Sequence, residues 1–450
     1  MGRADSIHGA GKQMEPDCIK WPAMFPDIED MGVSLKRVLL ALTLPCVAAQ
    51  AIAEVELPER RKDQFPTDSG YYLVPSPYSI PGLGSGFILI GAMTNVKHSH
   101  TDAYGFAATG DIQGYGLFAT EIHLLEKKLI LDLTATSFNK ATSQVYRQRG
   151  MRTSADDYIL AELDRNDFTG ARLTWTLFDR RLEFYGLVYN NKTRLAAIRD
   201  RDGNLIQSTI DSELARSKSY SYGARIDLTD DYVDPRRGMR VESSLWHSPP
   251  DNNDSPDFDI IELNLTGYVP IGKRDTIALN YFQADTHILR TGQTDPSLVE
   301  SSLGLDCAAG SLQDQADCRS IVDDRVAENT YGSVGSLGGL SRLRSYPEDR
   351  FKGSHAKFVG IEYRWNLVEE TRPFDYFFAK DIRTVIQFAA FYERGAISDD
   401  KGELWSAMRE SYGVGARLVT KSGLVFRADI ATGDEGREVS IIFGYPWEVF

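Results

Sequence analysis

Hydrophobic and polar residues alternate along most of the chain from Gly86 onward, with a period of two residues rather than 3.6. Aliphatic and aromatic residues fill one set of positions, while charged residues, Thr and Gly fill most of the other set. The pattern is clearest in residues 170–177, 221–227, 358–365 and 424–431. It predicts β-strands with one apolar and one polar face.

About sixteen segments of this kind follow one another, and we expect no helix of three turns between them. Their expected starts are Gly86, Tyr104, Gly114, Leu129, Phe168, Leu182, Tyr220, Met239, Phe258, Thr276, Tyr331, Lys357, Thr384, Met408, Leu424 and Val439. Many have about 9–11 residues, the length at which a tilted strand crosses a bilayer. An even strand count is typical of single-chain membrane barrels. The sequence therefore predicts an all-β fold, a transmembrane antiparallel β-barrel of about 16 strands over residues 86–450. A soluble antiparallel sheet with one hydrated face is the alternative.

Residues 31–53 have the three regions of a secretory signal peptide in the usual order. Lys36 and Arg37 precede a short apolar stretch, and an A-x-A site ends at Ala53. We therefore expect cleavage between Ala53 and Glu54. Residues 1–30 are polar and irregular, so we expect a start-site artefact or a disordered segment there.

After the expected cleavage site, residues 54–85 are rich in proline and predict a short periplasmic segment. The chain ends in an aromatic segment at Phe450, which is typical of chains delivered to the outer-membrane assembly machinery. Export and this ending together predict the bacterial outer membrane as the location. We expect outer-membrane lipid as a partner, and the assembly machinery as a partner for the chain's own insertion.

The charge and the cysteine content of the chain limit which partners and covalent bonds we expect. The net charge is −14 and no basic stripe is present, so we expect no nucleic-acid partner. Beyond the expected cleavage site the only cysteines are Cys307 and Cys318, close together in a polar stretch. In an exported chain this spacing predicts a disulfide. A redox or metal pair is the alternative.

We expect no enzyme activity and no cofactor. The sequence contains no G-x-S-x-G motif, and its seven histidines form no cluster with metal-ligand spacing. His98 and His100 come nearest to such a pair, but a hydrated loop explains them as well. A Ser/His/acid site assembled across strands leaves no trace in sequence and stays open as an alternative.

One loop carries a specific signature. Gly338, Gly339, Leu343, Ser345 and Tyr346 belong to the segment 337–346, which precedes a strand containing Glu-Tyr-Arg at 362–364. This arrangement resembles the bacterial surface antigen superfamily, which includes BamA-type assembly barrels and two-partner secretion transporters. There, a G-G-x-x-x-(V/L)-R-G-(F/Y) loop leads into an E-Y-R strand. Residues 234–238, 391–395, 411–417 and 426–429 resemble further family motifs in the same order.

The resemblance implies that this loop folds into the barrel and that Arg344 tethers it to Glu362 and Glu393. The alternation independently points both carboxylates into the lumen, where a guanidinium can bridge them. A plug that only maintains the shape of the barrel is the alternative role. Ser345 replaces the family's glycine, which costs about 1 kcal/mol if the position needs a positive φ. Glu393 replaces the usual aspartate.

The family resemblance also implies a function. Relatives carry periplasmic POTRA domains, for which residues 54–85 are too few, so the chain resembles a subgroup without them. We expect a barrel that helps to translocate or insert protein or lipid, with a separate periplasmic partner or a client polypeptide. Its first and last strands are expected to form a weak seam because of Gly86, Gly91 and Pro446. A plugged pore or a structural surface barrel is the alternative.

Overall fold

The computed structural model describes residues 61, 64–65, 69–208, 214–250, 252–369, 374–376, 379–382, 384–420 and 425–447. The chain divides into two units, Met1–Val55 and Glu56–Phe450, and the second is described below. Residues 1–30, the signal at 31–53 with its cleavage site Ala53–Glu54, and Phe450 lie outside the described residues.

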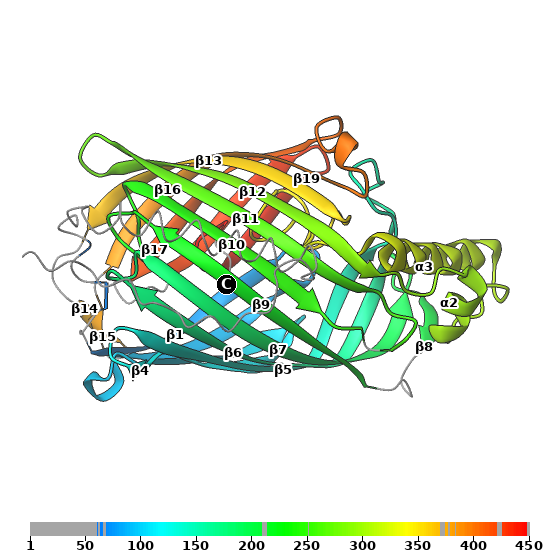
Figure 1. Ribbon diagram of the computed structural model, residues 1–450, viewed down its shortest axis with the longest axis horizontal. Coiled ribbons are helices and arrows are strands. Elements are labelled where there is room, and N and C mark those ends of the chain that lie inside the picture. The colour runs from blue at the N-terminus through cyan, green and yellow to red at the C-terminus, as the bar shows by residue number, and fades with distance from the viewer. Residues whose placement is uncertain are drawn as a thin grey trace, which may run out of the picture. The chain divides into compact units, whose positions relative to one another are not determined.

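Sixteen antiparallel strands form a closed barrel (Figure 1). The wall runs through β1 (Gly70–Ile80), β2 (Gly84–Thr94), β3 (Asp102–Gly110), β4 (Gln113–Leu125), β5 (Leu129–Tyr146), β6 (Tyr158–Leu177), β7 (Leu182–Arg199), β9 (Ala215–Asp227), β10 (Gly238–Ser248), β11 (Asp257–Ile271), β12 (Asp275–Arg290), β13 (His355–Glu369), β16 (Thr384–Ser398), β17 (Arg409–Thr420), β18 (Val425–Gly433) and β19 (Gly436–Phe443). Each strand pairs with the next, and β19 meets β1.

Shorter elements lie in the links between these strands. They are β8 (Leu205–Ser208), β14 (Phe374–Tyr376), β15 (Ala379–Ile382), η3 (Val96–His98), η4 (Lys401–Glu403), α2 (Pro296–Ser302) and α3 (Leu312–Tyr331). We call the end of the barrel where β1 begins and β19 finishes the turn end. The opposite end, which carries links 147–157, 200–214 and 291–354, is the loop end.

The two faces of the wall differ as the alternation predicts. On β13, Val359, Ile361, Tyr363 and Trp365 point outward and are between 36% and 50% exposed. At the alternate positions of the same strand, Phe358, Glu362 and Arg364 are at most 2% exposed and point into the lumen. The same division holds on β9 and β18. The outside is therefore apolar along the wall, as a strand that faces lipid requires.

The barrel begins earlier than the sequence predicts. Residues 70–80, expected to be part of a short periplasmic segment, form β1 and pair with β2 over its whole length. Pro75 and Pro77 concealed this strand, because proline is normally confined to strand edges. The unbroken ladder to β2 requires that both prolines direct their missing N–H toward the other edge of β1, the edge facing β19.

The seam between β1 and β19 is short. Among the described residues, these strands share one pair of register partners, Ser79 and Ile441, and the Ser79 hydroxyl donates to the Val439 carbonyl at 2.9 Å. Toward the turn end, β1 pairs instead with β15. The last strand expected to begin near Val439 ends at Phe443, and residues 444–447 leave the wall. The weak seam therefore lies at Pro75 and Pro77, and not at Gly86 and Gly91 of the expected first strand.

The prediction of a strand that begins near Tyr331 is wrong, because Tyr331 is the last residue of the 20-residue helix α3. This helix also contradicts the expectation that none of three turns would occur. A capping box starts it, in which Ser311 and Asp314 bond each other's backbone N–H groups. No helix in the described ranges is both long enough and apolar enough to span a membrane.

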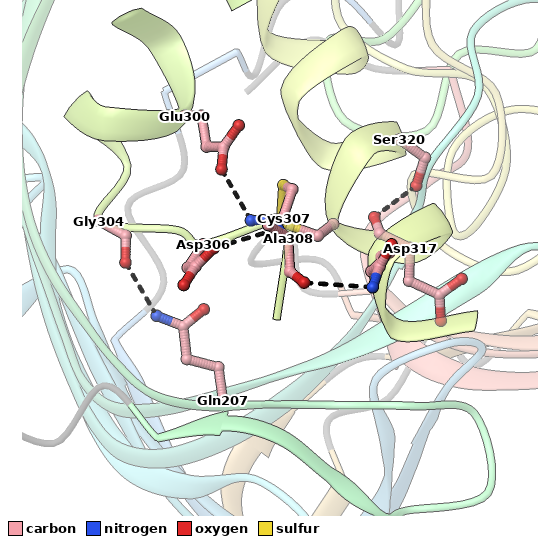
Figure 2. The surroundings of a disulfide bond; sticks show 10 residues. Gln207, Glu300, Gly304, Asp306, Cys307, Ala308, Asp317 and Ser320 are labelled. Carbon is pink, nitrogen blue, oxygen red and sulfur yellow. Dashed lines mark hydrogen bonds between the residues drawn. A yellow bond between two sulfur atoms is a disulfide. The ribbon is translucent and has the colours of Figure 1, made fainter. Parts of the chain in front are cut away.

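Helices α2 and α3 form a small insertion at the loop end (Figure 1). The expected disulfide between Cys307 and Cys318 joins α3 to the preceding loop, and Figure 2 shows its surroundings. The carboxylate of Glu300 accepts the N–H of Cys307 at 2.7 Å. Arg147, from the link between β5 and β6, forms an ion pair with Asp317 of α3. The insertion is thus fastened both internally and to a neighbouring loop.

Replacing the disulfide by Cys307→Ser together with Cys318→Ser should loosen the insertion alone. Closing so short a loop contributes on the order of 3 kcal/mol, and the barrel ladders do not depend on it. We expect limited proteolysis to cut within 291–331 much faster, while the thermal midpoint of the barrel stays within a few degrees. Equal cleavage rates in variant and parent would contradict this role.

Candidate functional site: the inward loop and its tether

The link 332–354 folds into the barrel and forms an apolar core there. Leu337, Leu343, Tyr346 and Phe351 of this inward loop are fully buried. They pack with inward-facing residues of β11, β12, β13 and β16 and with Trp447, a cluster that includes Tyr268, Ala278, Phe282, Ala284, Ala356, Phe358, Ala396 and Ile397. The lumen at this level is therefore filled by protein.

The two glycines of the signature allow the loop to turn back on itself. Gly338 and Gly339 have φ values of 113° and 94°, which residues with a Cβ atom rarely adopt. A Cβ on Gly339 would lie 1.9 Å from the carboxylate of Glu348, and one on Gly338 would lie 2.5 Å from the Pro347 carbonyl. Both conformation and space require glycine at these positions.

Ser345 sits without the backbone strain considered from the sequence. It is not among the residues with positive φ, whereas Leu343, two residues earlier, has φ 54°. The N–H of Ser345 donates to the hydroxyl of Ser411 at 3.0 Å. A Cβ atom on Gly433 of β18 would lie 2.3 Å from the hydroxyl oxygen of Ser345, so glycine at this position leaves space for the Ser345 side chain.

Arg344 contacts both carboxylates assigned to it by the family resemblance. Its Nε donates to Glu393 at 2.9 Å and its Nη2 donates to Glu362 at 3.2 Å. The backbone N–H of Arg344 also donates to Glu393, at 3.0 Å. The guanidinium lies 3.4 Å from the ring centre of Phe391. All three charged side chains are fully buried, so the tether is shielded from solvent.

Several further residues of this site could not be assigned from the sequence. Asp429 accepts from Nη1 of Arg344 at 2.9 Å, and Glu362 also binds Arg364 and Arg417 at 2.8 and 2.6 Å. Arg427 donates to the carbonyl of Leu340 at 2.7 Å. The alternation places all of these residues on the inward face, which was the available signal. Distance along the chain concealed which of them meet.

Burial and charge act in opposite directions at the loop. Burial would lower the pKa of Arg344, but the carboxylates of Glu393, Asp429 and Glu362 raise it above its ordinary value. Burial lowers the pKa of Arg342, which has no hydrogen-bonded carboxylate, to about 10. Burial raises the pKa of Glu348 to about 7, although the Leu340 N–H bond opposes this. Arg344 is therefore firmly charged, whereas Glu348 titrates near neutral pH.

The inward loop binds both flanks of the seam. The N–H of Glu348 donates to the carbonyl of Pro81 in the turn between β1 and β2, at 2.8 Å. On the other flank, Arg350 makes a two-pronged contact with Glu435, in the turn between β18 and β19, with both distances 2.7 Å. Arg344 reaches Asp429 on β18. One loop thus connects the strands on either side of the weakest junction in the wall.

The chain after β19 also enters the lumen. The indole N–H of Trp447 donates to Glu393 at 2.9 Å, and the amide of Asn264 on β11 donates to the Trp447 carbonyl at 2.8 Å. The hydroxyl of Tyr445 donates to Asp234 at 2.8 Å. The aromatic ending, expected to complete the last strand, is therefore folded onto the tether as far as Trp447.

The histidines considered from the sequence serve other contacts. His98 lies 3.5 Å from the hydroxyl of Ser69, while the ring of His100 stacks on that of His123 with centres 4.7 Å apart. Within the described part of the chain, no group of three or more His, Cys, Asp or Glu residues could hold a metal ion.

Removal of the tether should destabilise the barrel strongly. Arg344→Ala leaves Glu393 and Asp429 buried without their partner, a change that costs about 3–5 kcal/mol. We expect a matching fall in the free energy of unfolding in urea, and a smaller fall for Arg344→Lys, which keeps the charge without the planar fork. The control is Arg394→Gln, which breaks the exposed pair with Glu410 and should change little. Similar losses in Arg344→Ala and the control would refute the tether.

Glu348 should make stability depend on pH. Its pKa in the folded protein, about 7, exceeds the ordinary value of 4.5. The contribution of protonated Glu348 to the free energy of unfolding is therefore fully present below about pH 4.5, and it is lost as the pH rises through about 7. We expect the unfolding midpoint to fall between pH 5 and 8, and to fall less in Glu348→Gln, which keeps the acceptor for Leu340. An unchanged pH profile in this variant would argue against the assignment, with Asp349→Asn as the control.

The solved structures that are similar to the chain include two kinds of outer-membrane barrel. BamA from Haemophilus ducreyi lacking POTRA domains 1–3 is 12% identical, with 84% of this chain and 69% of that chain covered and a TM-score of 0.43. CdiB from Escherichia coli is 12% identical, with 83% of this chain and 61% of that chain covered and a TM-score of 0.49. CdiB from Acinetobacter baumannii is 10% identical, with 83% of this chain and 59% of that chain covered and a TM-score of 0.45. This chain thus spans about three fifths of the CdiB structures. No protein-family model matches the sequence, and no curated protein matches it.

Proposed function

We propose that the chain is an outer-membrane barrel that helps to insert or translocate polypeptide, and that its β1–β19 seam opens during that process. The proposal rests mainly on one observation. Among the described residues, fifteen junctions of the wall have ladders of several residues, whereas the β1–β19 junction has one pair. A junction with so few backbone bonds costs less free energy to open than any other.

The apolar outer face supports the location. Strands with outward aliphatic and aromatic residues and inward charges suit a bilayer, and a closed wall leaves no unpaired edges in lipid. The turn end then faces the periplasm and the loop end faces outward. The disulfide at the loop end agrees with an oxidising environment.

The inward loop and the C-terminal residues give the seam a defined closed state. Arg344 and Arg350 attach the loop to β18 and to the β18–β19 turn, while Glu348 attaches it to the β1–β2 turn. Opening at β1 therefore breaks the Glu348 attachment, the contacts of Ser79 with β19 and the short pairing of β1 with β15, while the Arg344 cluster is left intact. A client strand could then pair with the free edge of β19, which contains no proline. A periplasmic partner that delivers clients belongs to this proposal.

A passive plugged barrel is the second candidate. The apolar core between the inward loop and the wall favours it, because this core obstructs the lumen. The two candidates differ in whether the seam must move. Neither assigns catalysis to the chain, and an enzyme is not part of the proposal.

A covalent lock across the seam distinguishes them. Ser79→Cys with Ile441→Cys places two thiols on register partners. If the seam opens in function, oxidised protein in a strain that lacks the wild-type gene should give the deletion phenotype, namely altered levels of other outer-membrane proteins. Reductant should restore normal levels.

The matched control is Leu89→Cys with Ala107→Cys, which joins register partners on β2 and β3. That junction already has a full ladder, so its lock should have no effect. If the seam lock also has no effect, although the deletion does, the seam does not open in function. The passive barrel would then be favoured.

A further inference from the structure

The lumen contains a second apolar surface that the inward loop does not cover. It lies on β1 to β4, where Tyr72, Ile88, Ile90, Ala92, Tyr104, Phe106 and Phe118 face inward and line a cavity of about 750 Å³. Tyr104 stacks on Phe118 with ring centres 4.8 Å apart. Phe282 and Phe358 under the loop are at most 4% exposed, whereas Phe106 and Phe118 are only partly buried. Apolar area left in contact with water has an unfavourable free energy, which a bound apolar group would relieve.

The opposite wall of this cavity is polar and carries both arginines and carboxylates, and Asp132 and Glu242 interact electrostatically with Arg172. Arg225 and Arg240 form ion pairs with Glu242 and Asp227 at 2.8 and 2.9 Å. Arg172 also lines the cavity, but no carboxylate among the described residues lies within ion-pair distance of it. Its guanidinium rests 4.0 Å from the ring centre of Tyr185, and its Nε is buried without a hydrogen-bond partner. A guanidinium in this state suits an anionic group.

The cavity also reaches the seam. Tyr72 of β1, Val425 of β18 and Phe443 of β19 all belong to its lining, and Trp447 separates it from the tether. A molecule from the surrounding bilayer therefore has its shortest route to the cavity along the junction with the fewest backbone bonds. A volume of about 750 Å³ lies within the range of sites that hold one small ligand.

We infer that this cavity binds a membrane-derived amphiphile, with its acyl chain against the apolar wall of β1 to β4 and its anionic headgroup at Arg172. The bound amphiphile would cover the partly buried rings and give the guanidinium of Arg172 a direct anionic partner. This inference does not require that a polypeptide passes the seam, so it stands or falls separately from the proposed transport.

Binding can be measured on the full protein, folded in detergent, by displacement of the fluorescent fatty acid cis-parinarate. The probes are palmitate, palmitoyl lysophosphatidate and the neutral hexadecanol. We expect at least one of the two anions to bind about tenfold more tightly than hexadecanol, because a charge-assisted hydrogen bond contributes about that factor. The better anion identifies the headgroup as a carboxylate or a phosphate.

Two variants test the two walls. Arg172→Gln should abolish the preference for anions, while Arg165→Gln, on the same strand in an exposed pair with Asp167, should keep it. Ala92→Phe should fill the cavity and weaken all three probes by at least tenfold, while Leu89→Phe, which points outward on the same strand and does not line the cavity, should not. Heat-modifiable electrophoretic mobility verifies that each variant is folded.

A second measurement uses Trp447, a tryptophan in the lining of the cavity, as the reporter. Dibromostearate bound there should quench Trp447, so Trp447→Phe should remove a saturable part of the total quenching. Equal affinity for hexadecanol and both anions, or undiminished binding in Ala92→Phe, would overturn the inference. Quenching that rises linearly without saturation would also overturn it, since that result indicates partition into the micelle alone.

Discussion

The buried ionic cluster around Arg344 is the interaction on which the arrangement of the lumen depends. Four arginines, at 344, 364, 417 and 427, meet three carboxylates, at 362, 393 and 429, with all side chains at most 2% exposed. Taking such charges out of water is costly, and only near-complete pairing offsets the cost. The loop therefore has one position in which its arginine is satisfied. That position sets the apolar core beneath the loop and the place of Trp447.

The same cluster explains how a wall with an incomplete junction stays closed. Pro75 and Pro77 remove two backbone donors from the edge of β1, and the chain after Phe443 turns away from the wall. In lipid, unpaired backbone groups are unfavourable, so the seam needs support from elsewhere. The inward loop provides it by contacting the turns on both sides. Contacts of the inward loop within the lumen thus stabilise the closed seam in place of the missing backbone hydrogen bonds.

Much of this architecture could be predicted from the sequence, and its failures have physical causes. Alternation identified the barrel, fifteen of its sixteen strands and the inward direction of Glu362 and Glu393, because the outer face of each strand is apolar. The count agreed only because two errors cancelled: β1 was concealed by its prolines, and the end of α3 was taken for a strand. Family resemblance supplied Arg344, but Asp429 meets Arg344, and Arg417 meets Glu362, from distant strands. Pairing across the lumen depends on strand order and register, which alternation does not encode.

The least expected feature, an apolar surface inside the lumen, has a trace in the sequence. Phe87, Ile88, Leu89 and Ile90 form an uninterrupted apolar run, whereas a strand between lipid and a polar lumen should alternate. Uninterrupted runs are typical of strands covered on both faces. On β2, Phe87 and Leu89 point outward, while Ile88 and Ile90 pack with Tyr72 on the lumen side, outside the core of the inward loop. The apolar run of β2 thus reflects an apolar cluster of the wall inside the lumen, and an acyl chain bound there would extend that cluster.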